Sequence, residues 1–351
     1  MQLDQALLQA ASRELLASSS VMLLTHVRPD GDAIGSMMGL GLALREASKE
    51  VQMVLPDGMP SSYRFLPGSD LVIRRPQAAV DFICVVDCSD LGRPGDVLEE
   101  GRIPDLNIDH HITNLNFARL NLVDTAAVST TQIIQEILRF LEWPLSPFVA
   151  AALLTGLITD TIGFRTPNVT SHALRQAADL MDAGGDLADL YQRSLISKSY
   201  EAARLWGAGL SRLERDGRLV WTTLTLEDRR SANYPGRDDA DLINLLSSID
   251  SADVVIIFTE LTNGQVKVSW RSQPGFDVSQ VALAFGGGGH AAASGAEITG
   301  SLQQVQTLVL EATRPVLSGN DFGVNSANPN GPGQSNGLRI VRSSLREMRN
   351  G

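Results

Sequence analysis

Residues 21–47 read VMLLTHVRPDGDAIGSMMGLGLALREA. A short apolar run is followed by a polar loop and then by a longer segment whose apolar residues recur at helical spacing. Within the loop, Pro29 restricts the backbone and Gly31 permits a positive φ, so Asp30 and Asp32 can point in different directions. The stretch therefore predicts a strand, a turn that carries ligand-type side chains, and a helix.

The same alternation continues through the first half of the chain. The strand-like runs are VQMVLP, FICVVD and LNID, and the helical stretches that follow them are TTQIIQEILRFL and FVAAALLTGLI. Because parallel neighbours need crossover connections, this pattern predicts an α/β domain with a doubly wound, mainly parallel sheet. We expect this domain to span residues 1–186.

The second half of the chain predicts a separate and smaller α/β domain with a mixed sheet. Residues 187–215 have a polar-rich helical pattern and are expected to form a helical linker, so the second domain is placed at residues 216–317. Strands are expected at 219–226 and 254–261, and the turn TNGQ leads from the latter into VKVSWRS, which predicts a hairpin. Residues 318–351 contain too few apolar side chains to order themselves and are expected to be a flexible tail.

Composition limits the classes of protein that this chain can belong to. The longest apolar run is about ten residues, against the roughly 20 that a membrane span requires. The N-terminal segment lacks the basic start and continuous apolar stretch of a signal peptide, so we expect a cytoplasmic protein without a membrane partner. Cys84 and Cys88 lie about 13 Å apart if the segment is extended, which is too far for a disulfide, and both are expected to be buried thiols.

The formal net charge of −11 argues against a large basic groove for long nucleic acid. A small anionic substrate remains compatible with this charge, because bound divalent cations would add local positive charge. Nothing in the sequence decides the oligomeric state, and a homodimer stays open.

Ligand-type side chains occur at four places in the first half, each at the end of an apolar run. They are His26 with Asp30 and Asp32, then Asp87, then Asp109 with His110 and His111, and finally Asp160. The first three places follow strands and the fourth follows a helix, and the carboxyl ends of strands in an open α/β sheet converge on one crevice. One aspartate before a helix is usually an N-cap, but the combination is not explained in that way. Oxygen and imidazole ligands without thiolates favour manganese or magnesium, and two such ions would suit an in-line phosphoryl displacement.

These segments carry a family resemblance. HVRPDGDAIGS, VVDCSD, IDHH with the following LVDTAAVSTTQI, and GLITDT resemble motifs I to IV of the DHH phosphoesterases. VSWRS and FGGGGHAAASG in the second half are similar to the DHH-associated domain, in the arrangement of the NrnA-type oligoribonucleases and pAp phosphatases. The resemblance covers roughly residues 15 to 316, and the ordered combination is much more specific than any single motif.

The resemblance implies a role for each matching residue. His26, Asp30 and Asp87 would hold one ion, while Asp32, Asp87, His110 and Asp160 would hold the other, with Asp87 as the bridge. His111 would contact the scissile phosphate or the leaving group, and Asp109 would orient a histidine ring. The implied cofactor is a pair of divalent ions, Mn²⁺ first, with Mg²⁺ or Co²⁺ as alternatives. At motif IV, Arg165 stands in a shifted position, so the role of the family's arginine there stays open.

A glycine run in the second half predicts a substrate-binding loop. Gly286, Gly287, Gly288 and Gly289 precede His290, and their backbone N–H groups could form an anion-binding nest. The alternative is the C-terminal cap of a short helix that begins near Asp277. Alternation along VKVSWRS places Arg271 on a polar face, where it could bind a substrate phosphate away from the metals.

The favoured function is hydrolysis of RNA or DNA oligonucleotides of about two to five nucleotides and of 3′-phosphoadenosine 5′-phosphate (pAp) at a two-metal centre. The alternative is a phosphodiesterase for cyclic-di-AMP or pApA. A non-catalytic nucleotide-binding regulator is disfavoured because all motif positions are filled, and a pyrophosphatase because the glycine loop implies a larger substrate.

Overall fold

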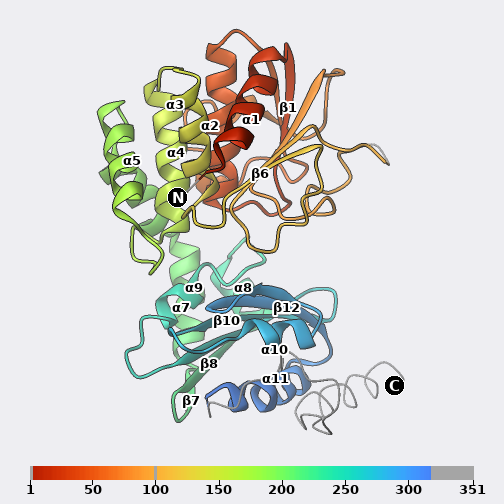
Figure 1. Ribbon diagram of the computed structural model, residues 1–351. Helices are drawn as coiled ribbons and strands as arrows, with labels where there is room; N and C mark the ends of the chain where they lie inside the picture. The colour runs from red at the N-terminus through yellow and green to blue at the C-terminus, as the bar shows by residue number, and fades with distance from the viewer. Residues whose placement is uncertain (1–2, 99–100, 318–351) are drawn as a thin grey trace, which may run out of the picture. The chain divides into compact units, whose positions relative to one another are not determined.

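The computed structural model describes residues 3–98 and 101–317, and the chain divides into two compact units between Ser197 and Lys198 (Figure 1). This division falls inside the segment for which a helical linker is predicted, while the boundaries at residues 186 and 215 stay predictions. The expected tail, 318–351, lies outside the described residues.

Unit 1 is built on a six-stranded parallel sheet. Its strands are β1 (Ser20–Leu24), β2 (Glu50–Val54), β3 (Val72–Ile73), β4 (Phe82–Val86), β5 (Leu106–Asp109) and β6 (Leu120–Val123). The spatial order is β3-β2-β1-β4-β5-β6, and every pairing is parallel. The order reverses between β1 and β4, which is the topological switch point of a doubly wound sheet. The predicted fold class is confirmed.

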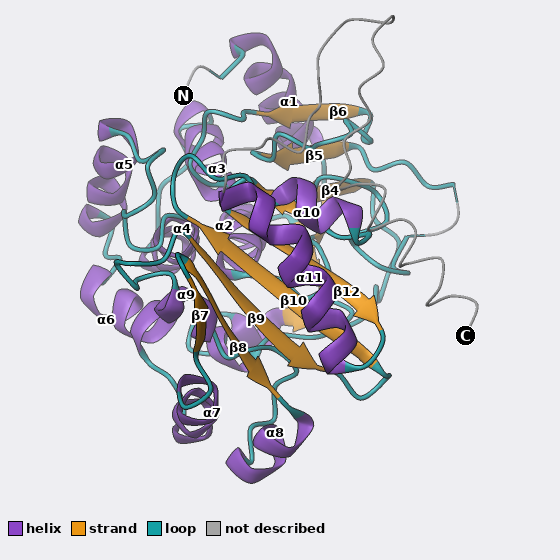
Figure 2. Ribbon diagram, turned by 90° about the horizontal axis from the view of Figure 1, so that it is seen from below, coloured by secondary structure: helices purple, strands orange, loops and turns teal. Residues whose placement is uncertain are grey.

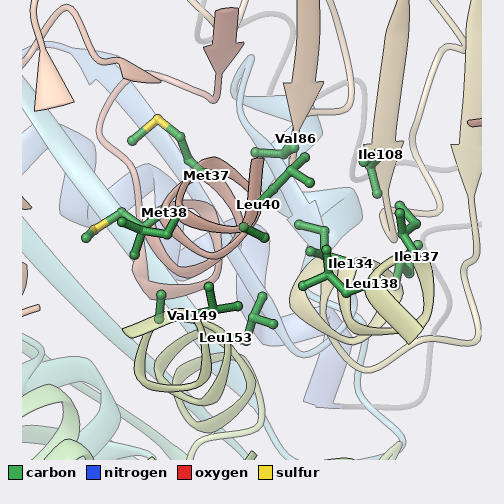
Figure 3. Close-up of a cluster of buried hydrophobic side chains, with 14 of the residues drawn as sticks. Met37, Met38, Leu40, Val86, Ile108, Ile134, Ile137, Leu138, Val149 and Leu153 are labelled. Carbon is green, nitrogen blue, oxygen red and sulfur yellow. The ribbon is translucent and has the colours of Figure 1, made fainter. Parts of the chain in front are cut away.

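The helical segments of unit 1 cover one face of this sheet. They are α1 (Gln5–Ala17), α2 (Gly31–Glu46), α3 (Thr130–Phe140), α4 (Pro147–Asp160), α5 (Ser171–Asp182) and α6 (Leu187–Tyr191), with the shorter turns η1 (Ser61–Tyr63), η2 (Ser69–Leu71) and η3 (Gln192–Ile196). Figure 3 shows Leu40 of α2 beside Val86 of β4, with Leu153 of α4 below them. On the opposite face, strand residues such as Val85 pack against side chains from loops, among them Val97 and Phe117.

Helices α2 and α4 pack unusually closely through glycines. Gly31, Gly35 and Gly39 are spaced four residues apart, so they lie along one face of α2. A Cβ at Gly35 would lie within 3 Å of backbone atoms of Ala152 and Gly156 in α4. This contact places the beginning of α2 beside the end of α4, and thereby Asp32 beside Asp160.

Unit 2 is built on a mixed six-stranded sheet. Its elements are α7 (Tyr200–Leu210), β7 (Glu214–Asp216), β8 (Leu219–Leu224), α8 (Leu226–Ala232), α9 (Leu242–Leu246), β9 (Val254–Glu260), β10 (Gln265–Ser272), α10 (Ser279–Ala284), β11 (Gly288–His290), β12 (Ala293–Thr299) and α11 (Leu302–Leu317). The order is β11-β12-β10-β9-β8-β7, and β8 and β9 form the parallel pair. Strands β9 and β10 form the predicted hairpin. Helices α10 and α11 lie over one face of this sheet (Figure 2).

Both cysteines are free and buried, as predicted. Among the described helices, none combines the length and apolar character needed to cross a membrane.

Candidate metal centre

His26 lies just beyond β1, at the switch point of the sheet. Its Nδ1 is 2.9 Å from the carbonyl oxygen of Val27, which can only accept a hydrogen bond. The proton of the neutral ring therefore belongs on Nδ1, and Nε2, which lies 3.8 Å from Asp87 Oδ2, presents its lone pair to the carboxylates. Burial is the largest effect on this ring and lowers the pKa of His26, which favours the neutral, ligand form.

Asp30 and Asp32 occupy the first turn of α2 and have different partners. Asp30 is the N-cap, and its Oδ1 accepts from the backbone N–H groups of Asp32 and Ala33 at 3.1 and 3.0 Å. Asp32 is buried and accepts instead from the N-terminus of α3, where the N–H groups of Thr130 and Thr131 lie at 2.6 and 3.1 Å. The N-cap interpretation thus holds for Asp30, whose exposed side chain also lies beside His26 and Asp87.

Asp87 follows β4 and has a left-handed backbone, with φ of 54°. This conformation is uncommon for a residue with a side chain. Its Oδ1 accepts a hydrogen bond of 2.9 Å from the hydroxyl of Thr130, and the side chain is almost fully buried. Thr130 therefore positions Asp87 through its hydroxyl and Asp32 through its backbone.

His110 and Asp160 complete the cluster from β5 and α4. His110 Nε2 lies 3.5 Å from Asp160 Oδ2, 3.8 Å from Asp87 Oδ1 and 3.9 Å from Asp32 Oδ2. Its Nδ1 lies 3.3 Å from the carbonyl oxygen of Ala127, so this ring also directs Nε2 at the carboxylates.

His111 and Asp109 form a pair beside this cluster. His111 Nδ1 lies 2.7 Å from Asp109 Oδ1 and 3.7 Å from Asp87 Oδ1. Asp109 also accepts from the backbone N–H of His110 and, through Oδ2, from the side-chain amide of Asn114 at 2.5 Å. Burial opposes the charged form of Asp109, but these hydrogen bonds dominate and lower its pKa.

Ligand-type atoms gather in three overlapping groups, each within 4.8 Å. They are His26 with Asp30 and Asp87, Asp32 with His110 and Asp160, and Asp87 with His110 and His111. The first group is the whole set that the resemblance implies for one ion, and the second is three of the four residues implied for the other. The fourth, Asp87, lies 3.8 Å from His110 Nε2.

The cluster holds several buried carboxylates close together, an arrangement that nearby positive charge would stabilise. Burial raises the pKa of Asp32 and, with the repulsion of Asp32 and Asp30, raises that of Asp87 well above its ordinary value. Burial and the charge of Asp32 raise the pKa of Asp160 to about 8. Like charges held this close favour protonation unless positive charge lies between them. Carboxylates and imidazoles without thiolates are suitable ligands for Mn²⁺ or Mg²⁺, so the residues fit a pair of divalent ions.

The turn after Asp160 has an unusual backbone. Ile162, Gly163 and Phe164 have φ values of 49°, 69° and 63°. Left-handed backbone is costly for a β-branched residue, on the order of 1–3 kcal/mol, and such strain is concentrated near functional sites. Arg165, for which the motif comparison left the role open, is exposed on this turn.

In unit 2, the strand register brings Arg271 and His290 into one row. Ala293 pairs with Arg271 on β10 and with His290 on β11, so the three residues lie side by side across three strands and on the same face. In the next row, Gly295 lies between Ser269 and Gly288. The small residue Ala293 thus separates the arginine from the histidine, and small residues also occupy the neighbouring row. Burial lowers the pKa of Arg271, and the nearby Asp239 and Asp241 oppose this effect.

The predicted nest at the glycine run needs correction. The N–H groups of Gly286 and Gly287 donate to the carbonyl oxygens of Leu283 and Ala282, at 3.0 and 2.9 Å, and so cap helix α10. These two groups are already used by the fold. Gly288 and Gly289 continue into β11, so the run is a helix cap followed by an edge strand instead of a loop of four open donors.

Sequence reasoning missed Thr130, Thr131 and Asn114 as residues that position the cluster. A signal was present for the threonines, because Ser129 with Gln132 three residues later is a typical capping pattern that places Thr130 and Thr131 in the first turn of an amphipathic helix. The glycine spacing of α2 was a second signal for close helix packing, and it was also missed.

Comparison with known proteins is consistent with this geometry. A family model described as the DHH family, N-terminal domain, matches residues 20–157, and one described as the DHHA1 domain matches residues 226–315. The Thermus thermophilus protein named bifunctional oligoribonuclease and PAP phosphatase NrnA is 36% identical over 304 residues, which cover 85% of this chain and 90% of that relative. This chain belongs to the DHH family.

Two other proteins resemble this chain to different extents. Cyclic-di-AMP phosphodiesterase GdpP of Geobacillus thermodenitrificans is 26% identical across 82% of this chain but only 46% of its own length. The crystal structure of an exopolyphosphatase-related protein from Bacteroides fragilis superposes with a TM-score of 0.82 at 27% identity, covering 90% of this chain and 98% of that one. The resemblance drawn from the motifs is confirmed.

Proposed function

We propose that this chain is a phosphoesterase that hydrolyses short oligonucleotides and pAp at a two-metal centre in unit 1. The observation that carries the proposal is the convergence of six carboxylate and imidazole side chains at the switch point of the sheet. They are His26, Asp30, Asp32, Asp87, His110 and Asp160. The similarity over nearly the full length to a bifunctional oligoribonuclease and PAP phosphatase supports this substrate class.

Two divalent ions, Mn²⁺ first, are part of the proposal. When bound, they would supply a nucleophile at neutral pH and offset charge on the phosphoryl oxygens. His26 and His110 would present Nε2 to them, because their Nδ1 atoms face carbonyl oxygens. Thr130 would hold the carboxylate of Asp87 in place beside the other ligands.

His111 and Asp109 would act in the transfer of a proton to the leaving oxygen. The short contact between His111 Nδ1 and Asp109 Oδ1 favours a proton on Nδ1, so Nε2 would first take up a proton from solvent and then donate it to the leaving oxygen. Asn114 would keep Asp109 in place through its hydrogen bond to Oδ2.

Unit 2 would recognise the end of the substrate. Arg271 and His290 stand on either side of the small residue Ala293, an arrangement that suits a terminal phosphate and its nucleoside. We include Gly288 in this proposed surface because neither packing nor backbone conformation requires a glycine at this position. A Cβ there would meet nothing within 4 Å, and its φ does not demand glycine.

A second candidate, hydrolysis of cyclic-di-AMP, is supported by the similarity to GdpP. The chemistry at unit 1 would be the same, and the difference would lie in whether a free terminal phosphate is needed. Cytoplasmic location and a homodimer stay predictions from the sequence.

The metal centre is tested with Asp87→Asn. Asparagine tolerates the left-handed backbone that Asp87 has, so this variant removes the charge and leaves the fold intact. We expect activity on pAp and pApA to require an added divalent ion, and kcat to fall by about a hundredfold or more in the variant.

The matched control is Asp182→Asn, which removes an exposed carboxylate at the end of α5. Circular dichroism checks folding, and Mn²⁺ titration checks the ions. Full activity of the wild-type chain in excess chelator, or near-normal turnover by folded Asp87→Asn, would contradict the two-metal proposal.

A further inference from the structure

Arg93 lies in the loop after β4, and this loop is tied to the loop that carries His26. The backbone N–H of Val27 donates to the carbonyl oxygen of Arg93 at 2.8 Å. Val27 directly follows His26, so the hydrogen bond joins the loops that leave β1 and β4. These are the two strands on either side of the switch point, and Arg93 is therefore held at the rim of the metal centre.

The side chain of Arg93 is also directed along this rim. Its Nη1 makes a long contact of 3.5 Å with the hydroxyl of Ser89, a buried residue two positions after Asp87. The side chain is half-buried, so one side still faces solvent.

Arg93 lacks the carboxylate partner that several arginines of the chain have. Arg139 and Arg218, for example, lie 2.7 and 2.5 Å from a carboxylate. Within the part of the chain that the structure describes, Arg93 forms no such ion pair, and its one side-chain partner is the neutral Ser89. A guanidinium that is held in place beside a metal-type cluster, with no carboxylate of its own, suits an anionic ligand.

We propose that Arg93 binds a non-bridging oxygen of the phosphate that is hydrolysed. This inference rests on the proposed function and adds a phosphate-binding residue within unit 1 that the motifs did not indicate. Its role differs from that of Arg271, because the hydrolysed phosphate is common to all substrates, whereas a terminal phosphate is not. Removing Arg93 should therefore lower kcat/KM for every substrate. Removing Arg271 should lower it only for substrates that carry a terminal phosphate.

The first test compares two substrates in three variants. Bis(p-nitrophenyl) phosphate has a single phosphodiester and no terminal phosphate, while pApA has both kinds of group. We expect Arg93→Gln, which keeps a donor for Ser89 but loses the charge, to lower kcat/KM for both by about tenfold or more. Arg93→Lys should keep more activity than Arg93→Gln, since the charge remains, and Arg271→Ala should affect pApA alone.

The second test does not depend on turnover. Inorganic phosphate is titrated by calorimetry into the Mg²⁺-loaded protein, and Mg²⁺ into the protein without phosphate. Arg93→Gln should weaken phosphate binding by about tenfold and leave the affinity for Mg²⁺ unchanged. Arg175→Ala is the control, because Arg175 has a serine hydroxyl as its partner too, at 3.3 Å, but lies on α5.

Each outcome decides for or against the proposal. Unchanged phosphate affinity in Arg93→Gln, or a loss explained entirely by weaker Mg²⁺ binding, would overturn it and leave Arg93 as a neutraliser of the aspartates. If the wild-type chain hydrolyses none of the esters, the proposed function fails, and the phosphate titration still judges Arg93 independently.

Discussion

At the scale of single residues, backbone conformation and side-chain chemistry act together at the metal centre. Asp87 has a left-handed backbone that a side chain normally avoids, and the hydroxyl of Thr130 holds its carboxylate. The neighbouring aspartates raise its pKa well above the ordinary value, after burial as the main cause. An arrangement that is unfavourable for folding in the absence of cations is expected where cations bind.

The glycine run of unit 2 also separates into individual roles. A Cβ on Gly287 would overlap the carbonyl oxygen of Gly295, so Gly287→Ala should destabilise the chain by about 2 kcal/mol or more. A Cβ on Gly288 would meet open space, so Gly288→Ala should leave stability within about 0.5 kcal/mol and raise KM for pApA. Denaturant unfolding and steady-state kinetics measure the two effects. Normal KM in Gly288→Ala would remove this residue from the proposed substrate surface.

At the scale of elements, the position of Asp160 depends on how α2 packs against α4. Ligands from β1, β4 and β5 are brought together by the sheet itself, because neighbouring parallel strands end at one edge. Asp160 is the last residue of a helix, and the close glycine contacts of α2 with α4 help to bring it beside Asp32. The metal centre therefore needs both a sheet edge and one close helix pair.

Two glycine substitutions in helices are expected to change the free energy of unfolding in opposite directions. Gly35→Ala would force a Cβ into the backbone of α4, so it should destabilise unit 1 by about 2 kcal/mol or more and weaken Mn²⁺ binding. Gly207→Ala, in the exposed interior of α7, meets nothing within 4 Å and should stabilise the chain by about 0.5–1 kcal/mol. Thermal unfolding with and without Mn²⁺ gives both values. If Gly35→Ala is destabilised but binds Mn²⁺ with unchanged affinity, the packing of α2 on α4 does not control the placement of the metal ligands.

At the scale of the whole molecule, the charge and the two units restrict the substrate. A net charge of −11 offers little non-specific attraction for a long polyanion. The candidate sites are local instead, with a cation-demanding cluster in unit 1 and the row of Arg271, Ala293 and His290 in unit 2. Local sites of this kind suit small anionic substrates better than a long nucleic acid.

The choice between linear and cyclic substrates follows from the proposed end recognition. Linear pApA and pAp carry a terminal phosphate that Arg271 can bind, whereas cyclic-di-AMP contains only diesters. We expect kcat/KM for the linear substrates to be about ten times that for cyclic-di-AMP or more, which corresponds to about 1.4 kcal/mol of transition-state binding. A panel assay with Mn²⁺ measures the ratio. Equal or faster cleavage of cyclic-di-AMP would reject end recognition and favour the second candidate function.

The sequence by itself determined the fold class and the candidate ligands of the metal centre. Strand-length and helix-length apolar runs specified the parallel sheet, because side-chain periodicity reflects which face is buried. His26, Asp87 and His110 could be assigned to one crevice since each directly follows a strand, and strand ends converge whatever the details of packing.

Only the tertiary structure decided what depends on contacts between distant segments. The pairing of α2 with α4, the hydrogen bond from Thr130 to Asp87 and the tie between Val27 and Arg93 join residues far apart in the chain. The glycine run illustrates the same limit. Four glycines suggested open donors, yet two of their N–H groups donate hydrogen bonds to carbonyl oxygens at the end of α10. A local pattern states which conformations are allowed, and the neighbours in space determine which hydrogen bonds are already taken.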